Sequence, residues 1–204
     1  ETVWLSENRQ PEWKMELSDD FSKPELGLQW TFWKEYEPKA LTFTEGEMRV
    51  KAKGYSPADG RLLLVTAMDK CYETEVEVRL GNGNIGGLLL YYNEEAYAGV
   101  TSDGKNFTVY RGEEKPLTVA NKIGKNFRVK LLNQGNRLKM SVSADGKSWE
   151  VLAQNVDVAR LNHNVYKGFY ALRPALFAAG KGKTGFRNFR YRNAIPEEKD
   201  MGAY

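Results

Sequence analysis

Apolar and polar residues alternate along much of this chain, and this pattern predicts β-strands. In the longest such segment, Cys71 to Leu80, the apolar side chains would share one face and the glutamates the other. Shorter alternating segments predict further strands, at Gln29–Trp33, Leu41–Phe43, Met48–Lys53, Phe127–Leu132 and Arg137–Ser143.

Two apolar runs, Leu62–Ala67 and Gly86–Tyr92, lack alternation, which is typical of strands that are buried on both faces. Asp-Gly pairs within SDGKNF (Ser102–Phe107) and SADGKSW (Ser143–Trp149) predict tight hairpin turns. No stretch keeps a helical period for three turns, so almost no helix is expected. About a dozen short strands separated by turns predict a β-sandwich or jelly roll.

The segment Asn164–Tyr191 carries many aromatic residues near the carboxyl end of the chain. It predicts two strands, Val165–Leu172 and Thr184–Tyr191, with an irregular connection between them. We expect so aromatic a terminal strand in the middle of a sheet, because burial offsets the entropy lost in ordering a chain end. The connection has Leu176 and Phe177 near its tip, so it must pack on its own core or on a neighbouring domain.

Length and composition fit one domain with a sizeable core, since the chain has 204 residues and 41% of them are hydrophobic. Five Trp, eleven Tyr and nine Phe, together with nineteen Gly, favour an all-β chain. We expect a lead-in or linker over residues 1–17, the sandwich over 18–192 and a polar tail over 193–204. Because the chain begins at Glu1 rather than Met, we expect it to be a processed or excised piece.

The charges are interspersed, with thirty basic and twenty-seven acidic residues and a net charge of +3. Without a basic tract, no nucleic-acid partner is expected. No apolar run approaches the ~20 residues of a membrane span, so no membrane partner is expected either. The single Cys71 excludes an internal disulfide and leaves the compartment open, with a periplasmic or extracellular one favoured.

Three glutamates, Glu73, Glu75 and Glu77, form a row of carboxylates and are the first candidates for catalysis. Neighbours two apart on a strand lie about 6.7 Å from each other, near the carboxyl spacing of glycosidases. The alternative is cross-strand charge pairing with basic residues that alternate elsewhere: Arg49, Lys51 and Lys53, and Arg128 and Lys130. Pairing is favoured, because no aromatic residue accompanies the glutamates to raise a carboxyl pKa.

Other reactive residue types give no metal site and no nucleophile. His163 is the only histidine, which excludes sites with several histidine ligands. Cys71 lies among glutamates, which raise rather than lower a thiol pKa. Asp19 and Asp20 could help to hold calcium, but SDDF serves equally as a strand entry. We therefore predict no metal and no cofactor.

Aromatic residues exceed what a core requires, and some should face outward. Trp30 and Phe32 would share one face of a strand, and Trp33 would lie on the other. With Tyr36 and with Tyr91, Tyr92 and Tyr97, they suit stacking on sugar rings or docking on a partner domain. The alternative is a thick aromatic core beneath loops.

Four segments resemble a known family: DDFSKPELGLQWTFW (Asp19–Trp33), KGYSPADGRLLLV (Lys53–Val65), GGLLLYYNEEAYAGV (Gly86–Val100) and HNVYKGFYALRPALFAAGKG (His163–Gly182). They are similar to the C-terminal concanavalin A-like β-sandwich of family 43 glycoside hydrolases, the β-xylosidase and arabinofuranosidase group. The resemblance runs from about Asp19 to Arg192. It implies an all-β, concanavalin A-like jelly-roll sandwich of two antiparallel sheets.

In that family the catalytic acids lie in an N-terminal five-bladed propeller, which is too large for this chain to contain. The resemblance therefore places no catalytic residue here. It implies a non-catalytic module of a plant-polysaccharide-degrading hydrolase that packs on the propeller, while one of its loops brings an aromatic side chain to the rim of the sugar pocket. The implied partners are the propeller and a xylo- or arabino-oligosaccharide.

Candidate docking or ligand contacts follow from this resemblance. The apolar loop around Phe177 is the first candidate for the rim, supported by Arg173, His163 and Asn164. Further candidates are the aromatic residues Trp30, Trp33, Tyr36 and Tyr92. Two alternatives stay open: a stand-alone carbohydrate-binding protein that uses these aromatics, and a small jelly-roll glycosidase that uses Glu73, Glu75 and Glu77.

Overall fold

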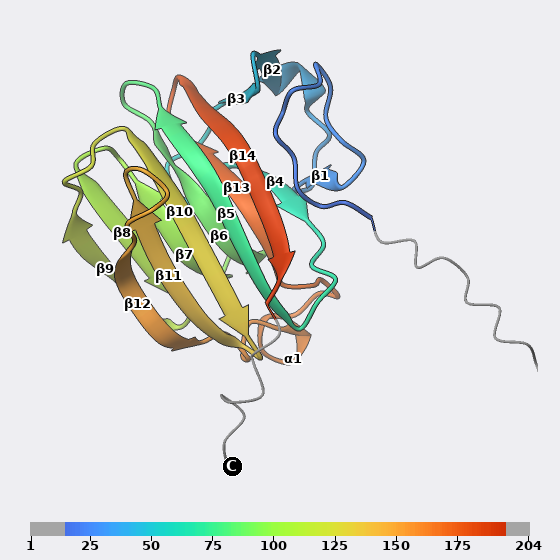
Figure 1. The fold of residues 1–204 in the computed structure, drawn as a ribbon. Coiled ribbons are helices and arrows are strands. Elements are labelled where there is room, and N and C mark those ends of the chain that lie inside the picture. Colours follow the sequence, from blue (N-terminus) through green and yellow to red (C-terminus); the bar gives the residue numbers. More distant parts are fainter. Residues whose placement is uncertain (1–14, 195–204) are drawn as a thin grey trace, which may run out of the picture.

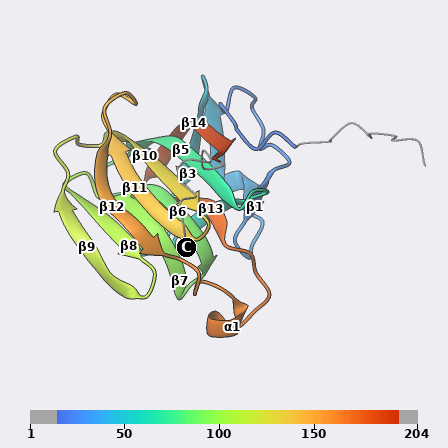
Figure 2. The same ribbon diagram turned by 60° about the horizontal axis from the view of Figure 1, so that its bottom comes forward.

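The structure, a computed structural model, describes residues 15–194, which form two antiparallel sheets of seven strands each (Figure 1). The sheets stack face to face as two layers (Figure 2). The predicted all-β sandwich with almost no helix is therefore confirmed. Most of the predicted lead-in and tail lies outside the described residues. Within residues 15–194, neither short helix has the length and apolar character needed to cross a bilayer.

The first sheet has the strand order β1-β4-β13-β6-β7-β8-β9. Its strands are β1 (Trp30–Phe32), β4 (Arg61–Val65), β13 (Arg173–Ala179), β6 (Ile85–Asn93), β7 (Ala96–Ser102), β8 (Asn106–Arg111) and β9 (Glu114–Ala120). The second sheet has the order β12-β11-β10-β5-β14-β3-β2. Its strands are β12 (Glu150–Asp157), β11 (Arg137–Ser143), β10 (Asn126–Gln134), β5 (Cys71–Leu80), β14 (Lys183–Asn193), β3 (Glu47–Lys51) and β2 (Leu41–Thr44). A 3₁₀ turn, η1 (Pro38–Ala40), and a one-turn helix, α1 (His163–Tyr166), complete the described elements.

Burial follows the predicted patterns in the central strands. In β5 the side chains of Tyr72, Val76 and Val78 point into the core between the sheets. In β4 and β6 both faces are covered, as their continuous apolar runs predicted. Leu63 joins the core between the sheets, while its neighbour Leu62 joins a second cluster on the outer face of the first sheet. A strand with two covered faces has no polar positions, which explains the missing alternation.

The terminal strand β14 lies between β5 and β3, so the prediction that it sits in the middle of a sheet is confirmed. The predicted strand Val165–Leu172 is wrong. That segment is α1 followed by a loop, and Lys167 and Gly168 in the loop have positive φ angles of 44° and 76°, outside the range of a regular strand. Asn162 starts the helical turn, because its side-chain oxygen accepts a hydrogen bond from the Asn164 N–H.

The residues predicted to connect the two strands form β13 instead, in the middle of the first sheet. Its run Ala175–Ala179 is buried on both faces, like β4 and β6. Pro174 lies in register with Leu90 of β6, whereas pairing with β4 begins only at Ala175, so a residue without a backbone N–H is tolerated at this end of the strand. Phe177 is therefore not at the tip of a loop.

Phe177 belongs to the outer cluster of the first sheet and is fully buried. The loop YSPADG (Tyr55–Gly60) covers its ring, and a Cβ on Gly60 would lie 2.3 Å from the Phe177 Cε2 atom. Only glycine permits this approach. The Asp59 carboxylate fixes the loop by accepting hydrogen bonds from the N–H groups of Tyr55 and Ser56, at 3.0 and 2.8 Å.

We expect Phe177→Ala to lower the free energy of unfolding by about 3–5 kcal/mol, because it removes a fully buried ring beneath a fixed loop. Urea unfolding of the isolated chain measures the change. The control is Leu117→Ala on edge strand β9, where the side chain is exposed and the change should stay within about 0.5 kcal/mol. A loss below about 1 kcal/mol in Phe177→Ala would contradict the described packing.

Candidate functional site

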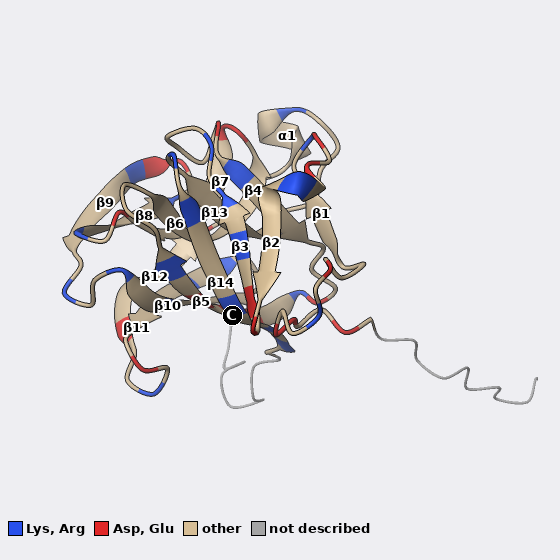
Figure 3. Ribbon diagram, turned by 90° about the horizontal axis from the view of Figure 1, so that it is seen from above, with Lys and Arg blue, Asp and Glu red and all other residues tan. Residues whose placement is uncertain are grey.

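The two outer faces of the sandwich differ in chemistry. We call the outward side chains of β3, β14, β5 and β10 the charged face. We call Trp33, Tyr91, Tyr97, Tyr110 and Arg173 on the first sheet, together with Tyr170, the aromatic face. Basic and acidic residues are otherwise interspersed over the molecule (Figure 3).

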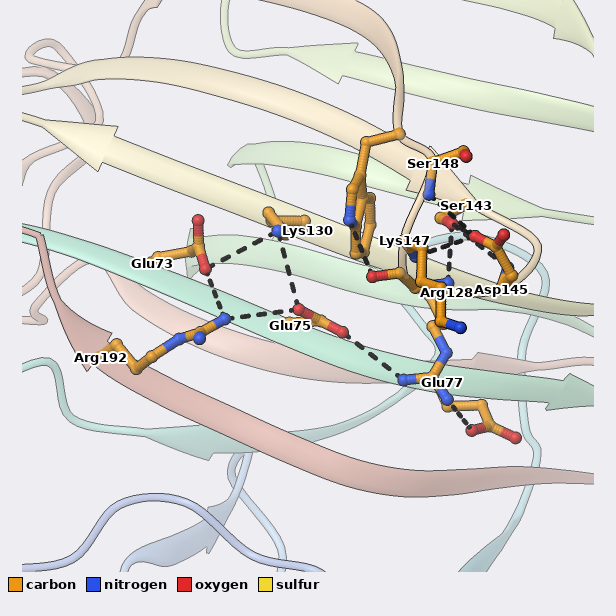
Figure 4. Close-up of polar contacts among 12 residues, drawn as sticks. Glu73, Glu75, Glu77, Arg128, Lys130, Ser143, Asp145, Lys147, Ser148 and Arg192 are labelled. Atoms are coloured by element: carbon orange, nitrogen blue, oxygen red, sulfur yellow. Dashed lines mark hydrogen bonds and ion pairs between the residues drawn. The ribbon is translucent and has the colours of Figure 1, made fainter.

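The glutamate row lies in the middle of the charged face, and each carboxylate contacts cations (Figure 4). Glu75 is almost fully buried and lies 3.6 Å from Arg128, 3.8 Å from Lys130 and 3.5 Å from Arg192. The predicted pairing with Arg128 and Lys130 is confirmed, since β10 is the neighbour of β5.

The predicted pairing of the row with Arg49, Lys51 and Lys53 is wrong. Strand β14 lies between β5 and β3, so the second neighbour of the glutamate strand is β14, and its Arg192 pairs with the glutamates instead. A general acid in a glycosidase needs an apolar pocket that keeps its proton. Glu75 is instead surrounded by three cations, so the arrangement fits charge pairing rather than acid catalysis.

A second buried carboxylate, Glu47, lies at the β3 end of the charged face. Its oxygens accept hydrogen bonds from the side chains of Arg49, Arg79 and Arg187. Burial raises the pKa of Glu47, but these three hydrogen bonds outweigh burial and lower the pKa to about 2. A Cβ on Gly185 would lie 2.9 Å from the Glu47 carboxyl carbon, so the glycine on β14 makes room for this cluster.

On the aromatic face the rings form a continuous series. Their centroids are 4.9 Å apart for Tyr170 and Trp33, 5.2 Å for Trp33 and Tyr91, 5.9 Å for Tyr91 and Tyr97, and 5.1 Å for Tyr97 and Tyr110. The Arg173 guanidinium lies 5.6 Å from the Trp33 ring centroid. Trp33, Tyr97, Tyr110 and Arg173 are only partly buried. Partly covered aromatic rings beside an arginine are the composition of interface hot spots.

Polar groups on the aromatic face are incompletely paired. The Trp33 indole N–H donates to the Glu94 carboxylate at 3.0 Å, and Lys34 also contacts Glu94. Burial raises the pKa of Glu94, but the hydrogen bonds from Lys34 and Trp33 outweigh it and lower the pKa. In contrast, the Tyr91 hydroxyl and Arg173 Nε are buried and have no hydrogen-bond partner among the described residues. Such groups favour an additional polar partner.

The loop after α1, residues 167–172, projects beside the aromatic face. Phe169 is 98% exposed and stacks on His163 of α1, with ring centroids 5.9 Å apart. The Tyr92 hydroxyl anchors the loop by donating a hydrogen bond to the Gly168 carbonyl at 2.7 Å. A fixed loop therefore presents an aromatic side chain to solvent, where it has little to stabilise it.

Some of the residues predicted to contact a ligand or partner lie close together in the structure, and others lie apart. Trp33 and Arg173 lie together on the aromatic face, and His163 and Asn164 lie on α1 beside it. Trp30 and Tyr92 are buried in the core between the sheets. Tyr36 is exposed and lies elsewhere, at a hollow that it lines with Glu37 and Arg61. Their functional roles stay predictions.

Sequence reasoning did not single out Phe169, Tyr170 or Tyr110. Phe169 and Tyr170 were assigned to a strand, where alternation would have buried one of them. The signal was Gly168, since a glycine before two aromatic residues permits the left-handed backbone that ends a strand. Among residues 15–194, no group of three or more His, Cys, Asp or Glu side chains could hold a metal ion.

Comparisons with known proteins agree with this architecture. The family described as the β-xylosidase C-terminal concanavalin A-like domain matches residues 18–192. The solved GH43 BlXynB protein of Bacillus licheniformis has a TM-score of 0.77 at 19% identity, covering 91% of this chain and 40% of that chain. The xylan β-1,4-xylosidase of Bacillus halodurans C-125 has a TM-score of 0.70 at 18% identity, and the match covers 90% of this chain and 40% of that chain.

A functionally unknown protein of Saccharomyces cerevisiae has a TM-score of 0.57 at 14% identity, with 82% of this chain and 98% of that chain covered. No curated protein matches the chain. At these identities the structural likenesses show the fold. The chain spans about 40% of the length of the two Bacillus proteins.

Glu47 gives a testable pH dependence of stability. Its pKa in the folded chain is lowered to about 2, so its contribution is present above the unfolded value of about 4.5 and is lost as pH falls toward 2. We expect this one carboxylate to account for a loss on the order of 3 kcal/mol over that window. Unfolding measured at several pH values checks this: between pH 4.5 and 2 the free energy of unfolding should change less in Glu47→Gln than in the wild type.

The matched control is Glu45→Gln, at an exposed position in the turn between β2 and β3. It should leave the acid dependence unchanged. Equal slopes for the wild type and Glu47→Gln between pH 4.5 and 2 would contradict the role given to the three arginines.

Proposed function

The chain belongs to the β-xylosidase C-terminal concanavalin A-like domain family, and we propose that it is the accessory, non-catalytic module of a plant-polysaccharide-degrading glycoside hydrolase. In this proposal it docks on a catalytic propeller and helps to shape the sugar pocket. The observation that carries the docking is the aromatic face with its projecting Phe169. The proposal needs a second folded body, and the two Bacillus proteins are more than twice as long as this chain.

Exposure of Phe169 supports docking on energetic grounds. A Phe side chain that moves from water into an interface contributes about 1.5–3 kcal/mol. Residues 167–172 are already held by Tyr92 and by Asn93, whose side chain donates to the Tyr166 carbonyl at 3.0 Å. Little conformational entropy is then lost when the loop docks. The stacked His163 fixes the direction in which Phe169 projects.

The aromatic face supplies the remainder of the proposed interface. Trp33 and Tyr170 form an edge-to-face pair beside Arg173, whose burial lowers its pKa. A partner carbonyl or carboxylate at Arg173 Nε would satisfy a donor that has no acceptor within the described chain. Rigid docking would exclude water from a neighbouring sugar pocket, and the chemistry would belong to residues of the propeller.

The same rings suit a stand-alone carbohydrate-binding protein, because aromatic faces also stack on sugar rings. The match covers 98% of the yeast protein, so this fold occurs there without a second domain in the same solved chain, which supports the alternative. Titration calorimetry of the isolated chain with xylo-oligosaccharides separates the two. Millimolar or undetectable affinity supports docking, whereas micromolar affinity supports a free-standing binding protein.

Catalysis by this chain gives a direct test. We expect the isolated chain to release no product from aryl xylosides or arabinosides, because its buried carboxylates are paired with cations. Glu75→Gln should therefore change nothing in this assay. Turnover by the isolated chain that is lost in Glu75→Gln would reject the accessory role.

Phe169→Ala tests the rim in the polypeptide or complex that contains the catalytic propeller. We expect the KM or kcat for oligosaccharides to change at least about fivefold, which corresponds to the ~1 kcal/mol that even one methylene contributes in a hydrophobic pocket. The melting temperature of the isolated chain should stay constant, since Phe169 is exposed. Val151→Ala, which truncates a 44% exposed apolar side chain on β12 of the second sheet, is the control and should leave kinetics unchanged. Unchanged kinetics in both variants would argue against a rim role.

A further inference from the structure

The charged face carries more cations than its ion pairs require. Its outward side chains on β3, β14, β5 and β10 include four carboxylates and nine basic groups: Glu47, Glu73, Glu75 and Glu77, against Arg49, Lys51, Arg79, Arg128, Lys130, Lys183, Arg187, Arg190 and Arg192. The difference of five positive charges exceeds the net charge of +3 for the whole chain. The positive charge of this protein is therefore concentrated on one side of one sheet.

The two signs of charge lie at different depths. The side chains of Glu47 and Glu75 are 3% and 6% exposed, whereas Arg49 and Arg192 are 49% and 52% exposed. Arg190, Lys51 and Lys183 are exposed as well. A ligand that approaches this face meets these exposed guanidinium and ammonium groups, with Glu47 and Glu75 beneath them. Glu73 and Glu77, each 21% exposed, lie at the same depth as Arg128 and Lys130. The outward potential is positive although every carboxylate is paired.

Trp149 borders the same face. Its indole lies against Lys130, whose Nζ is 4.0 Å from the ring centroid, and its N–H donates to the Gly146 carbonyl at 3.2 Å. The hairpin that carries it is fixed by Asp145, which accepts hydrogen bonds from the N–H groups of Lys147 and Ser148 at 2.8 and 2.9 Å (Figure 4). These contacts place a partly buried aromatic ring beside Arg128 and Lys130.

We propose that the charged face binds a carboxylate-bearing polysaccharide, a chain of uronic acid residues, with its carboxylates on the cations and a sugar ring against Trp149. The spacing favours such a ligand over nucleic acid. Cations two apart on a strand are separated by about 6.7 Å, whereas duplex DNA carries a charge every ~1.7 Å. A glycan with one carboxylate per ring matches the sparser array, and sugar rings have apolar faces that stack on indole. The site is separate from the aromatic face.

The test is titration calorimetry of the full chain with an oligogalacturonate of about ten units, with neutral xylo-oligosaccharide as the uncharged comparison. We expect binding of the acidic oligomer. Raising ionic strength from about 0.1 M to about 1 M should abolish it, because the screening length falls from ~10 Å to ~3 Å. The neutral oligomer should not compete.

Two matched double variants locate the site. Lys51→Gln with Arg190→Gln removes two exposed cations of the charged face that have no ion-pair partner among the described residues, so no buried carboxylate loses its partner. Affinity should fall about fivefold, in line with surface ion pairs. Lys105→Gln with Lys115→Gln removes the same charge from exposed positions of the first sheet and its hairpin, and should leave affinity unchanged.

Trp149→Ala distinguishes a glycan from a general polyanion. It should weaken oligogalacturonate binding but leave inorganic polyphosphate binding unaltered, with unfolding curves checked for both proteins. No binding of oligogalacturonate would overturn the proposal. So would equal losses in the two double variants, or polyphosphate binding that is tighter than glycan binding and independent of Trp149.

Discussion

Completion of both sheets by the last two strands is the constraint on which this fold depends. Strand β13 fills the place between β4 and β6, and β14 fills the place between β5 and β3. Without them, four internal strands would expose unpaired backbone groups, which is costly for buried peptide units. The crossing from one sheet to the other is held by buried Asn84, whose side-chain oxygen accepts the Gly182 N–H at 2.9 Å. The residues nearest the carboxyl end thus tie the two layers together.

This arrangement also decides what the outer faces can do. Because β14 lies between β5 and β3, Arg187 reaches the buried Glu47 and Arg192 reaches the buried Glu75, and each adds a cation to those that already pair with the carboxylate. Because β13 begins with Arg173 directly after residues 167–172, an arginine and the projecting loop meet at one end of the aromatic face. Ion pairs cover one face, whereas the other has aromatic surface and two buried polar groups, the Tyr91 hydroxyl and Arg173 Nε, that no residue in the described part of the chain pairs with.

Sequence reasoning predicted the class of fold and the strands with a clear period. Cys71–Leu80 is a strand with the predicted bounds, and both Asp-Gly hairpins are where they were expected. It failed for β13, which was predicted to be an irregular connection although the same continuous apolar pattern had identified β4. Phe177 was consequently assigned to a rim, whereas a loop more than a hundred residues earlier buries it. The order of strands in a sheet depends on long-range pairing, so the partner of the glutamate row could not be read from spacing alone.

The central claim is that a second folded body covers the aromatic face. Hydrogen–deuterium exchange of this chain, alone and joined to or mixed with the proposed catalytic propeller, measures this coverage most directly. We expect slower exchange in residues 163–173 and around Trp33 and Glu94 when the propeller is present, and no change along β10, β5 and β3. Unchanged exchange around residues 163–173, or protection confined to the charged face, would contradict it.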